Sequence, residues 1–328
     1  MLLSKRKILF FESDGPNKVD CRRILLSTGA QCFFPKTFDD LVETIKTDKF
    51  DIAVIDVDSH QKLPPPLRLS DTKLVLLSDK KLKDLTEYIP SVENFSNFLT
   101  KSPSGKVNER DLLVTIHNLL SDDIFGLRRY LNWGASNEIF YLRSSGERRE
   151  YIEAVLNFCQ RMQVKNIFIH SVQRFCEEIL MNAIYDAPRD RDGNEVYAKL
   201  PRTQHILLKP EESARLEVAC DGNRIAVSVT DLFGAISSKT LIAFLMKGFD
   251  KSSYASRMPT LGGAGLGIYL CYNSVSNLIV NVSPERKSEF IGLFEIGRSL
   301  KDLKKNHASI NYFRTDRVID HMYNGYAG

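Results

Sequence analysis

The sequence contains no apolar stretch long enough to cross a membrane, and its excess of positive charge is small. There are 45 Lys and Arg residues against 41 Asp and Glu residues, which gives a formal net charge of +4. A balance this close to neutral does not favour nucleic acid or an anionic membrane surface as a partner. The first residues also lack the long apolar region and the small-residue cleavage site of a signal peptide. We therefore expect a cytoplasmic protein that binds neither nucleic acid nor membrane.

Closely spaced cysteine pairs are missing as well. The six cysteines are scattered, and no two are separated by two residues as in a metal-binding or redox pair. Such cysteines in a cytoplasmic protein are expected to be reduced and buried. A chain of 328 residues with 43% hydrophobic and 26% charged residues is typical of a globular protein with two domains.

The N-terminal third contains short apolar runs that alternate with helical segments. The runs are continuously apolar, as in parallel strands that are covered on both faces. Strands are predicted at residues 7–11, 31–34, 51–56, 73–78 and 97–101, and a closing amphipathic helix at 108–120. The expected fold class is α/β with a doubly wound parallel sheet. A run of three prolines at 64–66 should truncate or remove the helix after the third strand, because proline lacks the N–H that a helix interior needs.

Polar residues stand at the carboxyl ends of these strands, where parallel sheets bind their ligands. They are Glu12, Ser13, Asp14, Asp56, Ser78 and Lys101. This set resembles the receiver domain of bacterial response regulators over about residues 5–121. The resemblance implies that Asp56 accepts a phosphoryl group and that Ser78 and Lys101 contact this group. It also implies that Glu12, Asp14 and Asp56 hold Mg²⁺.

The acidic pair of a receiver is replaced here by Glu12-Ser13, so one carboxylate is missing unless Asp14 takes its place. Fewer carboxylates should weaken the binding of Mg²⁺. A pseudo-receiver that is folded but never phosphorylated is therefore the alternative.

Three motifs follow one another in the C-terminal half. A helix predicted at about 168–185 carries Glu178 and Asn182, which are four residues apart and hence on one face. A hairpin with an Asp-Gly turn runs into Asp231. The third motif, at 261–268, is a glycine-rich turn that precedes a helix. Such a turn suits phosphate, because its free N–H groups and the helix dipole favour negative charge.

In this order the three motifs resemble the GHKL ATPase superfamily, and within it the anti-sigma-factor serine kinases, over about residues 138–297. The resemblance implies an α/β sandwich of the Bergerat type that binds ATP and Mg²⁺. By position, Asn182 would hold Mg²⁺, Glu178 would be the general base, and Asp231 would accept the adenine amine. The other cofactor-binding residues implied are Gly234, Gly263, Gly265, Leu266 and Gly267.

The sequence departs from this family in its first glycine box, which usually reads Asp-x-Gly-x-Gly. Phe233 and Ala235 occupy both usual glycine positions, which changes the expected shape of the pocket. Residues 247–261 would form the mobile lid, from which Lys247, Lys251 and Arg257 would reach the phosphates. Residues 189–210 lengthen the connection after the Asn182 helix and are expected to form a surface loop near the site.

The chain is therefore divided into a receiver-like domain at 1–121, a linker at 122–137, a GHKL-like domain at 138–300 and a C-terminal tail at 301–328. The linker is expected to hold a short amphipathic helix packed onto its neighbours, with a signalling helix or a dimer contact as the alternative. For the tail, the sequence leaves open a packed helix or a frayed end.

Together the two resemblances imply a bacterial signalling protein whose receiver-like domain regulates phosphoryl transfer from Mg-ATP to a Ser or Thr of a protein partner. The partner would be of the sigma-factor or anti-sigma-antagonist type, or an upstream histidine kinase, and a homodimer is a further option. Histidine kinase activity itself is not expected, because the linker has no His. The alternative is a non-catalytic protein that senses nucleotide or sequesters a partner, and the altered glycine box and receiver acids both favour it.

Overall fold

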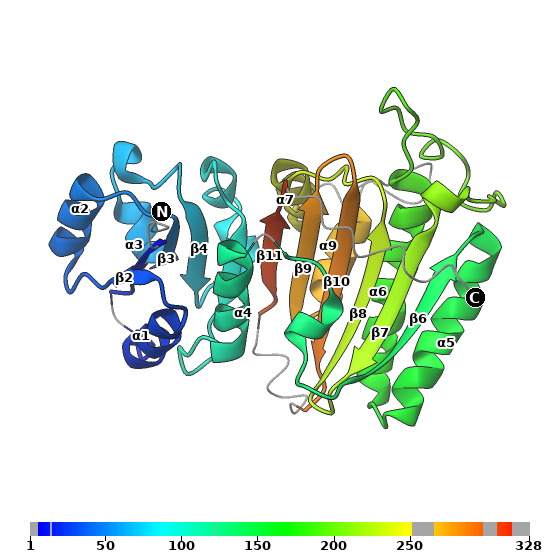
Figure 1. Cartoon of the computed structure of the whole chain (residues 1–328), viewed down its shortest axis with the longest axis horizontal. Coiled ribbons are helices and arrows are strands. Elements are labelled where there is room, and N and C mark those ends of the chain that lie inside the picture. Colours follow the sequence, from blue (N-terminus) through cyan, green and yellow to red (C-terminus); the bar gives the residue numbers. More distant parts are fainter. Residues whose placement is uncertain (1–5, 14, 122, 251–265, 298–306, 317–328) are drawn as a thin grey trace, which may run out of the picture.

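A single continuous sheet is the framework of the computed structural model (Figure 1). The structure describes residues 6–13, 15–121, 123–250, 266–297 and 307–316. Within these residues the sheet has 11 strands in the order β2-β1-β3-β4-β5-β11-β9-β10-β8-β7-β6. The fold is mixed α/β, because helices cover a sheet that is parallel at one end and mainly antiparallel at the other.

The N-terminal half-sheet consists of β2, β1, β3, β4 and β5, all of them parallel. Its elements are β1 (Lys7–Phe11), α1 (Lys18–Ser27), β2 (Gln31–Phe33), α2 (Phe38–Thr47), β3 (Ile52–Asp56), α3 (Val57–Lys62), β4 (Lys73–Ser78), β5 (Asn97–Thr100) and α4 (Glu109–Leu120). The five predicted strands are confirmed, and their order is one of the common doubly wound orders. The predicted truncation of the third helix is also confirmed, since α3 has only 6 residues and ends before Pro64.

The C-terminal half-sheet consists of β11, β9, β10, β8, β7 and β6, which are antiparallel except for the β11–β9 pair. Its elements are β6 (Ser136–Leu142), α5 (Arg148–Arg161), α6 (Asn166–Met181), β7 (Ala214–Cys220), β8 (Arg224–Asp231), α7 (Ser238–Phe249), α9 (Leu266–Ser274), β9 (Asn277–Ser283), β10 (Lys287–Glu295) and β11 (Ser309–Arg314). Helix α6 continues into a π turn over Asn182–Asp186.

Each face of the sheet carries one apolar core that extends through both half-sheets. On one face Phe98 of β5 and Phe294 of β10 belong to the same cluster, together with the apolar sides of α5, α6, α7 and α9. On the other face Leu99 of β5 and Phe313 of β11 share a cluster with α1 and α4. The two half-sheets are therefore joined by packing on both faces as well as by strand pairing.

The strand that joins the half-sheets comes from the predicted C-terminal tail. Strand β11 pairs in parallel with β9 along its whole length, from Ser309 to Arg314. On its other side it pairs antiparallel with β5 at only two positions, Ile310 with Phe98 and Asn311 with Asn97. The tail thus contributes a buried strand at residues 309–314. The sequence had left open a packed helix or a frayed end, and neither describes these residues.

The prediction of an amphipathic helix in the linker is wrong, whereas the prediction that the linker packs onto its neighbours is confirmed. Residues 127–130 form only a single 3₁₀ turn, because Gly126 before it has φ 104° and breaks any helical path. Leu127 and Tyr130 are buried against the sheet face opposite α5 and α6. Trp133, by contrast, is fully exposed.

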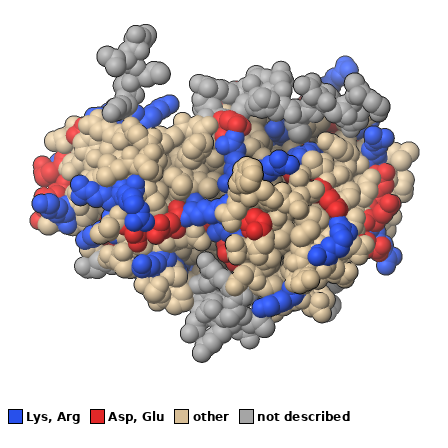
Figure 2. Space-filling view, turned by 60° about the horizontal axis from the view of Figure 1, so that its bottom comes forward, with Lys and Arg blue, Asp and Glu red and all other residues tan. Residues whose placement is uncertain are grey.

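Charged residues of both signs are interspersed on the face of the molecule in Figure 2, which is consistent with the small net charge. No helix within the described residues is long and apolar enough to cross a membrane.

Because β11 is enclosed between two half-sheets, truncating its core side chain should destabilise the whole fold. Ile310 is 0% exposed, and we expect Ile310→Ala to lower the free energy of unfolding by about 2–5 kcal/mol. Urea unfolding followed by circular dichroism measures this loss. The control is Val19→Ala on α1, where the side chain is 75% exposed, and it should change stability by no more than about 0.5 kcal/mol. Equal losses in the two variants would contradict the central place of β11.

Candidate functional site

Helices α6 and α9 bring three of the predicted site residues together. Glu178 lies in the last turn of α6, Asn182 begins the π turn that continues this helix, and Gly267 lies in the first turn of α9. A Cβ placed on Gly267 would stand 2.7 Å from Glu178 Oε2 and 3.7 Å from Asn182 Oδ1. The two oxygens therefore face the N-terminal turn of α9, and the first N–H groups of a helix have no partner within the helix and suit an anion.

The carboxyl of Glu178 is half-buried beside this turn. Burial raises its pKa above the usual range, and the negative charge of neighbouring Glu177 raises it further. Arg148 and Arg174 act in the opposite direction. A carboxylate whose pKa is shifted toward neutrality is a better proton acceptor at physiological pH.

Asp231 ends β8 and is buried, with 5% of its surface exposed. Its Oδ1 accepts the N–H of Phe233 at 2.9 Å and that of Gly234 at 3.4 Å. The hydroxyl and the N–H of Ser288, which lies opposite on β10, donate to it as well. Burial nevertheless dominates and raises the pKa of Asp231 to about 6. Ser288 was missed from the sequence, since only the strand register places its hydroxyl at this carboxylate.

A cavity of about 280 Å³ opens between α6, α7, α9 and the ends of β8 and β10. Asn182 and Asp231 both line it, although they are 49 positions apart in the sequence. Apolar side chains such as Ile179, Val229 and Phe290 form much of its wall. Apolar walls with a few polar groups at fixed positions are typical of small-molecule sites.

The loop after the π turn closes one end of this cavity, as its predicted place near the site requires. Arg202, Arg189 and Lys199 from the loop line the cavity. Arg202 donates to Asp186 at 2.6 Å and stacks on the ring of Tyr185. Its Nη1 is buried and has no hydrogen-bond partner among the described residues, so a donor is free at this end of the cavity.

The glycine residues of the candidate site fall into two groups. Gly263 and Gly265 lie outside the described residues, as does the greater part of the predicted lid, whereas Lys247 lies in α7 and Leu266 begins α9. Gly234 has φ +62°, and a Cβ there would meet Ser283 O at 2.1 Å. It packs against the turn between β9 and β10 and is not one of the residues that line the cavity.

A second polar cluster lies at the carboxyl ends of β1, β3 and β5. Lys101 Nζ forms an ion pair with Glu12 Oε1 at 2.6 Å, and both side chains are largely buried. Asp56 accepts the N–H of Ser13 at 3.0 Å and that of Ser59 at 2.9 Å, so that it also caps α3. Within the described residues, the ion pair of Lys101 is with Glu12 and not with Asp56.

The remaining predicted receiver residues are accounted for as follows. Ser78 ends β4 and is buried, and its hydroxyl accepts the N–H of Lys80 at 3.0 Å. Asp14 lies outside the described residues. The described members of the predicted set therefore lie at one edge of the sheet, as the carboxyl ends of parallel strands must.

The described residues contain no group of three or more His, Cys, Asp or Glu side chains arranged to hold a metal ion. Beside α9, the amide oxygen of Asn182 is a donor of the type that Mg²⁺ takes when its other ligands are phosphate and water. At the N-terminal cluster the fit is poor, because the Lys101 ammonium already occupies Glu12 and repels a second cation.

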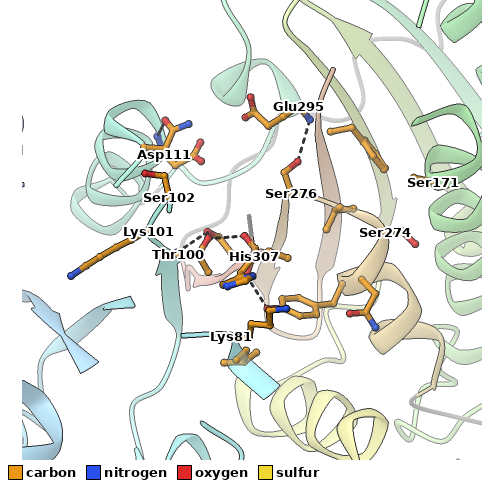
Figure 3. A pocket seen from close by; sticks show the side chains of 18 of the residues that line it. Lys81, Thr100, Lys101, Ser102, Asp111, Ser171, Ser274, Ser276, Glu295 and His307 are labelled. Atoms are coloured by element: carbon orange, nitrogen blue, oxygen red, sulfur yellow. Dashed lines mark hydrogen bonds between the residues drawn. The ribbon is translucent and has the colours of Figure 1, made fainter. Parts of the chain in front are cut away.

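A larger cavity, of about 740 Å³, separates the N-terminal half-sheet from α6 and α9 (Figure 3). Thr100, Tyr272 and His307 line it. The side chain of Lys101 extends away from its centre in Figure 3, as the ion pair with Glu12 requires.

No protein-family model matches the chain, and no curated protein sequence matches it. Among solved structures it is similar to one described as the SiaB-SiaC complex from Pseudomonas aeruginosa, with 18% sequence identity and a TM-score of 0.34. That similarity covers 48% of this chain and 88% of the other. A TM-score this low assigns neither a fold nor an activity.

Substitution of two glycines that have positive φ allows the cost of backbone strain to be measured separately from the cost of steric overlap. Gly193 has φ +81° and open space around it, whereas Gly234 has both a positive φ and a backbone oxygen in the way. Gly193→Ala should cost about 1–2 kcal/mol of stability from φ alone. Gly234→Ala should cost a further 1–3 kcal/mol or so, because the β9–β10 turn must move. Thermal unfolding of both variants measures the difference, and equal losses would show that the overlap at Gly234 relaxes freely.

Proposed function

We propose that the C-terminal half-sheet and its helices form a GHKL-type site that binds ATP, with the adenine amine on Asp231. The observation that carries this proposal is the buried carboxylate of Asp231 in a cavity that also contains Asn182. A buried ionised carboxylate is costly unless donors surround it, and an exocyclic amine would add one. The apolar wall of the cavity suits the faces of a purine ring.

The phosphates would lie at the opposite end, against the first turn of α9. The carboxylate of Glu178 approaches the helix backbone there so closely that a Cβ at position 267 would overlap with it. Mg²⁺, when bound, would neutralise phosphate charge, and the amide oxygen of Asn182 would be its protein ligand. The free N–H groups at the start of α9 would contact phosphate oxygens.

Phosphoryl transfer to a Ser or Thr of a protein partner is the reaction we favour. Glu178 would orient the hydroxyl and accept its proton, a role suited to a carboxylate whose pKa is raised by burial. The protein partner would be of the sigma-factor or anti-sigma-antagonist type, or a histidine kinase acting upstream, and the protein would act in the cytoplasm of a bacterium.

The N-terminal half-sheet would serve as a receiver-like regulator. Its strand order 2-1-3-4-5 and the buried Asp56 at the end of β3 support this assignment. The ion pair of Lys101 with Glu12 favours a second candidate, in which this half is a pseudo-receiver and the whole protein senses nucleotide without catalysis. Binding of ATP is common to both candidates, so catalysis is what separates them.

Nucleotide affinity should depend on pH through Asp231. Because its pKa is about 6, Asp231 is ionised at pH 7–8 and available to an amine, whereas below pH 6 a proton competes with the ligand. The affinity for ATP should therefore fall about tenfold per pH unit below the pKa. Calorimetric titrations from pH 8 to pH 5 measure this dependence.

The variant Asp231→Asn supplies the control for that titration. It should bind ATP about 10–100 times more weakly at pH 7.5, because it loses a charge-assisted hydrogen bond, and its affinity should lack the part of the pH dependence that Asp231 contributes. A wild-type affinity that stays constant from pH 8 to pH 5 would show that Asp231 does not contact the base.

The role of Glu178 is tested by comparing it with its neighbour on α6. Glu178→Gln should slow ATP turnover, measured as ADP formation, by about 100-fold or more, while the Kd for ATP changes little. Glu177 is exposed and bonded to Gln173, and its charge raises the pKa of Glu178 less than burial does. Glu177→Gln should therefore leave the Kd unchanged and slow turnover far less than Glu178→Gln does. Full turnover in Glu178→Gln would exclude it as the base, and ATP binding without turnover in the wild type would support the non-catalytic candidate.

A further inference from the structure

We propose that β11 couples the Glu12–Lys101 pair to the nucleotide site and thereby sets the affinity for nucleotide. This inference rests on the proposed function, because ATP affinity is the property that it regulates. It names a route for the regulation: from the N-terminal cluster to Thr100, along β11, and into two walls of the nucleotide cavity.

The first contact lies at the end of β5, where adjacent residues face two different sites. Thr100 donates its hydroxyl to His307 O at 2.7 Å and its N–H to Ser309 Oγ at 3.0 Å (Figure 3). The next residue, Lys101, holds Glu12 at 2.6 Å. A shift of the Lys101 side chain toward another partner therefore acts on the backbone that fixes the start of β11.

The second contact joins the start of β11 to α9. Tyr272 of α9 donates its hydroxyl to Ala308 O at 2.8 Å. Gly267 lies five residues earlier on the same helix, against Glu178 and Asn182. Because an α-helix moves as a rigid element over such a length, a displacement at Tyr272 also moves the proposed phosphate end of the site.

The third contact reaches the other end of the nucleotide cavity. Tyr312, within β11, donates its hydroxyl to Ile236 O at 3.1 Å. Ile236 lines the nucleotide cavity and follows the turn that begins at Asp231. Strand β11 and the residue before it are thus hydrogen-bonded to α9, which carries the proposed phosphate end, and to the segment that follows Asp231 at the proposed base end.

Strand β11 is held less firmly by β5 than by β9, so we expect its contact with β5 to shift first. Strand β11 has six paired positions with β9 but only two with β5. The cavity of about 740 Å³ adjoins Thr100, His307 and Tyr272, so the junction has space to rearrange on that side. Changes on the N-terminal side should therefore shift the junction without unpairing β11 from β9.

A double-mutant cycle tests the coupling. Glu12→Gln is the input, because it removes the charge that holds Lys101 while keeping the shape of the side chain. Thr100→Val removes the hydroxyl at the junction with little change of shape. We expect Glu12→Gln to change the Kd for ATP by about threefold or more in the wild-type background, and by much less in the Thr100→Val background.

A matched control comes from a tyrosine hydroxyl that lies off the route. Tyr88 is partly buried, and its hydroxyl bonds His60 of α3. In the Tyr88→Phe background the effect of Glu12→Gln should persist in full. Equal effects of Glu12→Gln in the wild-type and Thr100→Val backgrounds, or no effect in a chain that binds ATP, would overturn the proposal.

A second measurement distinguishes failure of this inference from failure of the proposed function. Amide hydrogen exchange needs no nucleotide, and Glu12→Gln should raise exchange in β11 and α9 while leaving β6 and β7 unchanged. If ATP does not bind, the proposed function fails but a change confined to β11 and α9 still supports the coupling. Unchanged exchange in both elements would overturn it.

Discussion

The backbone hydrogen bonds of one short strand, β11, decide the architecture of this molecule. Without its 6 residues, β5 and β9 would each present an unpaired edge, and two separate sheets would face water where one continuous sheet now stands. Insertion of β11 satisfies both edges and aligns the cores on the two faces. The relative position of the N-terminal cluster and the candidate nucleotide site is therefore fixed by strand pairing rather than by a flexible linker.

The same insertion explains an unusual polar layer on the sheet face that the linker covers. Asn311 of β11 donates to Asn277 of β9, and Asn281 donates to the buried Glu289 on β10. Glu289 also accepts the N–H of Gly126 and so fixes the linker to the sheet. Glu289 is only 1% exposed, and this burial raises its pKa. Buried polar groups are costly unless they are paired, so such a layer favours one register of strands and linker over its alternatives.

Much of the fold was predictable because its signals are local. Continuous apolar runs identified the parallel strands, and the spacing of Glu178 and Asn182 placed both on one helix face. The junction was not predictable in this way, because Thr100 and Ser309 are 209 positions apart and nothing in either segment specifies the other. Ser288 escaped notice for the same reason. The prediction of a helix in the linker was wrong, because Gly126 with φ 104° interrupts the helical path despite the favourable apolar pattern.

Phe233 and Ala235, which stand at the usual glycine positions of the first glycine box, were the strongest argument from the sequence against a nucleotide pocket. The backbone conformation of this turn removes part of that argument. Of residues 231–235, only Gly234 adopts a positive φ, and it is also the one that a Cβ would force into the β9–β10 turn. Phe233 and Ala235 stand where the backbone does not require glycine. The N–H groups of Phe233 and Gly234 still reach Asp231. The two substitutions therefore leave the carboxylate and its donors in place, and what they alter is the cavity wall, which Ala235 helps to line.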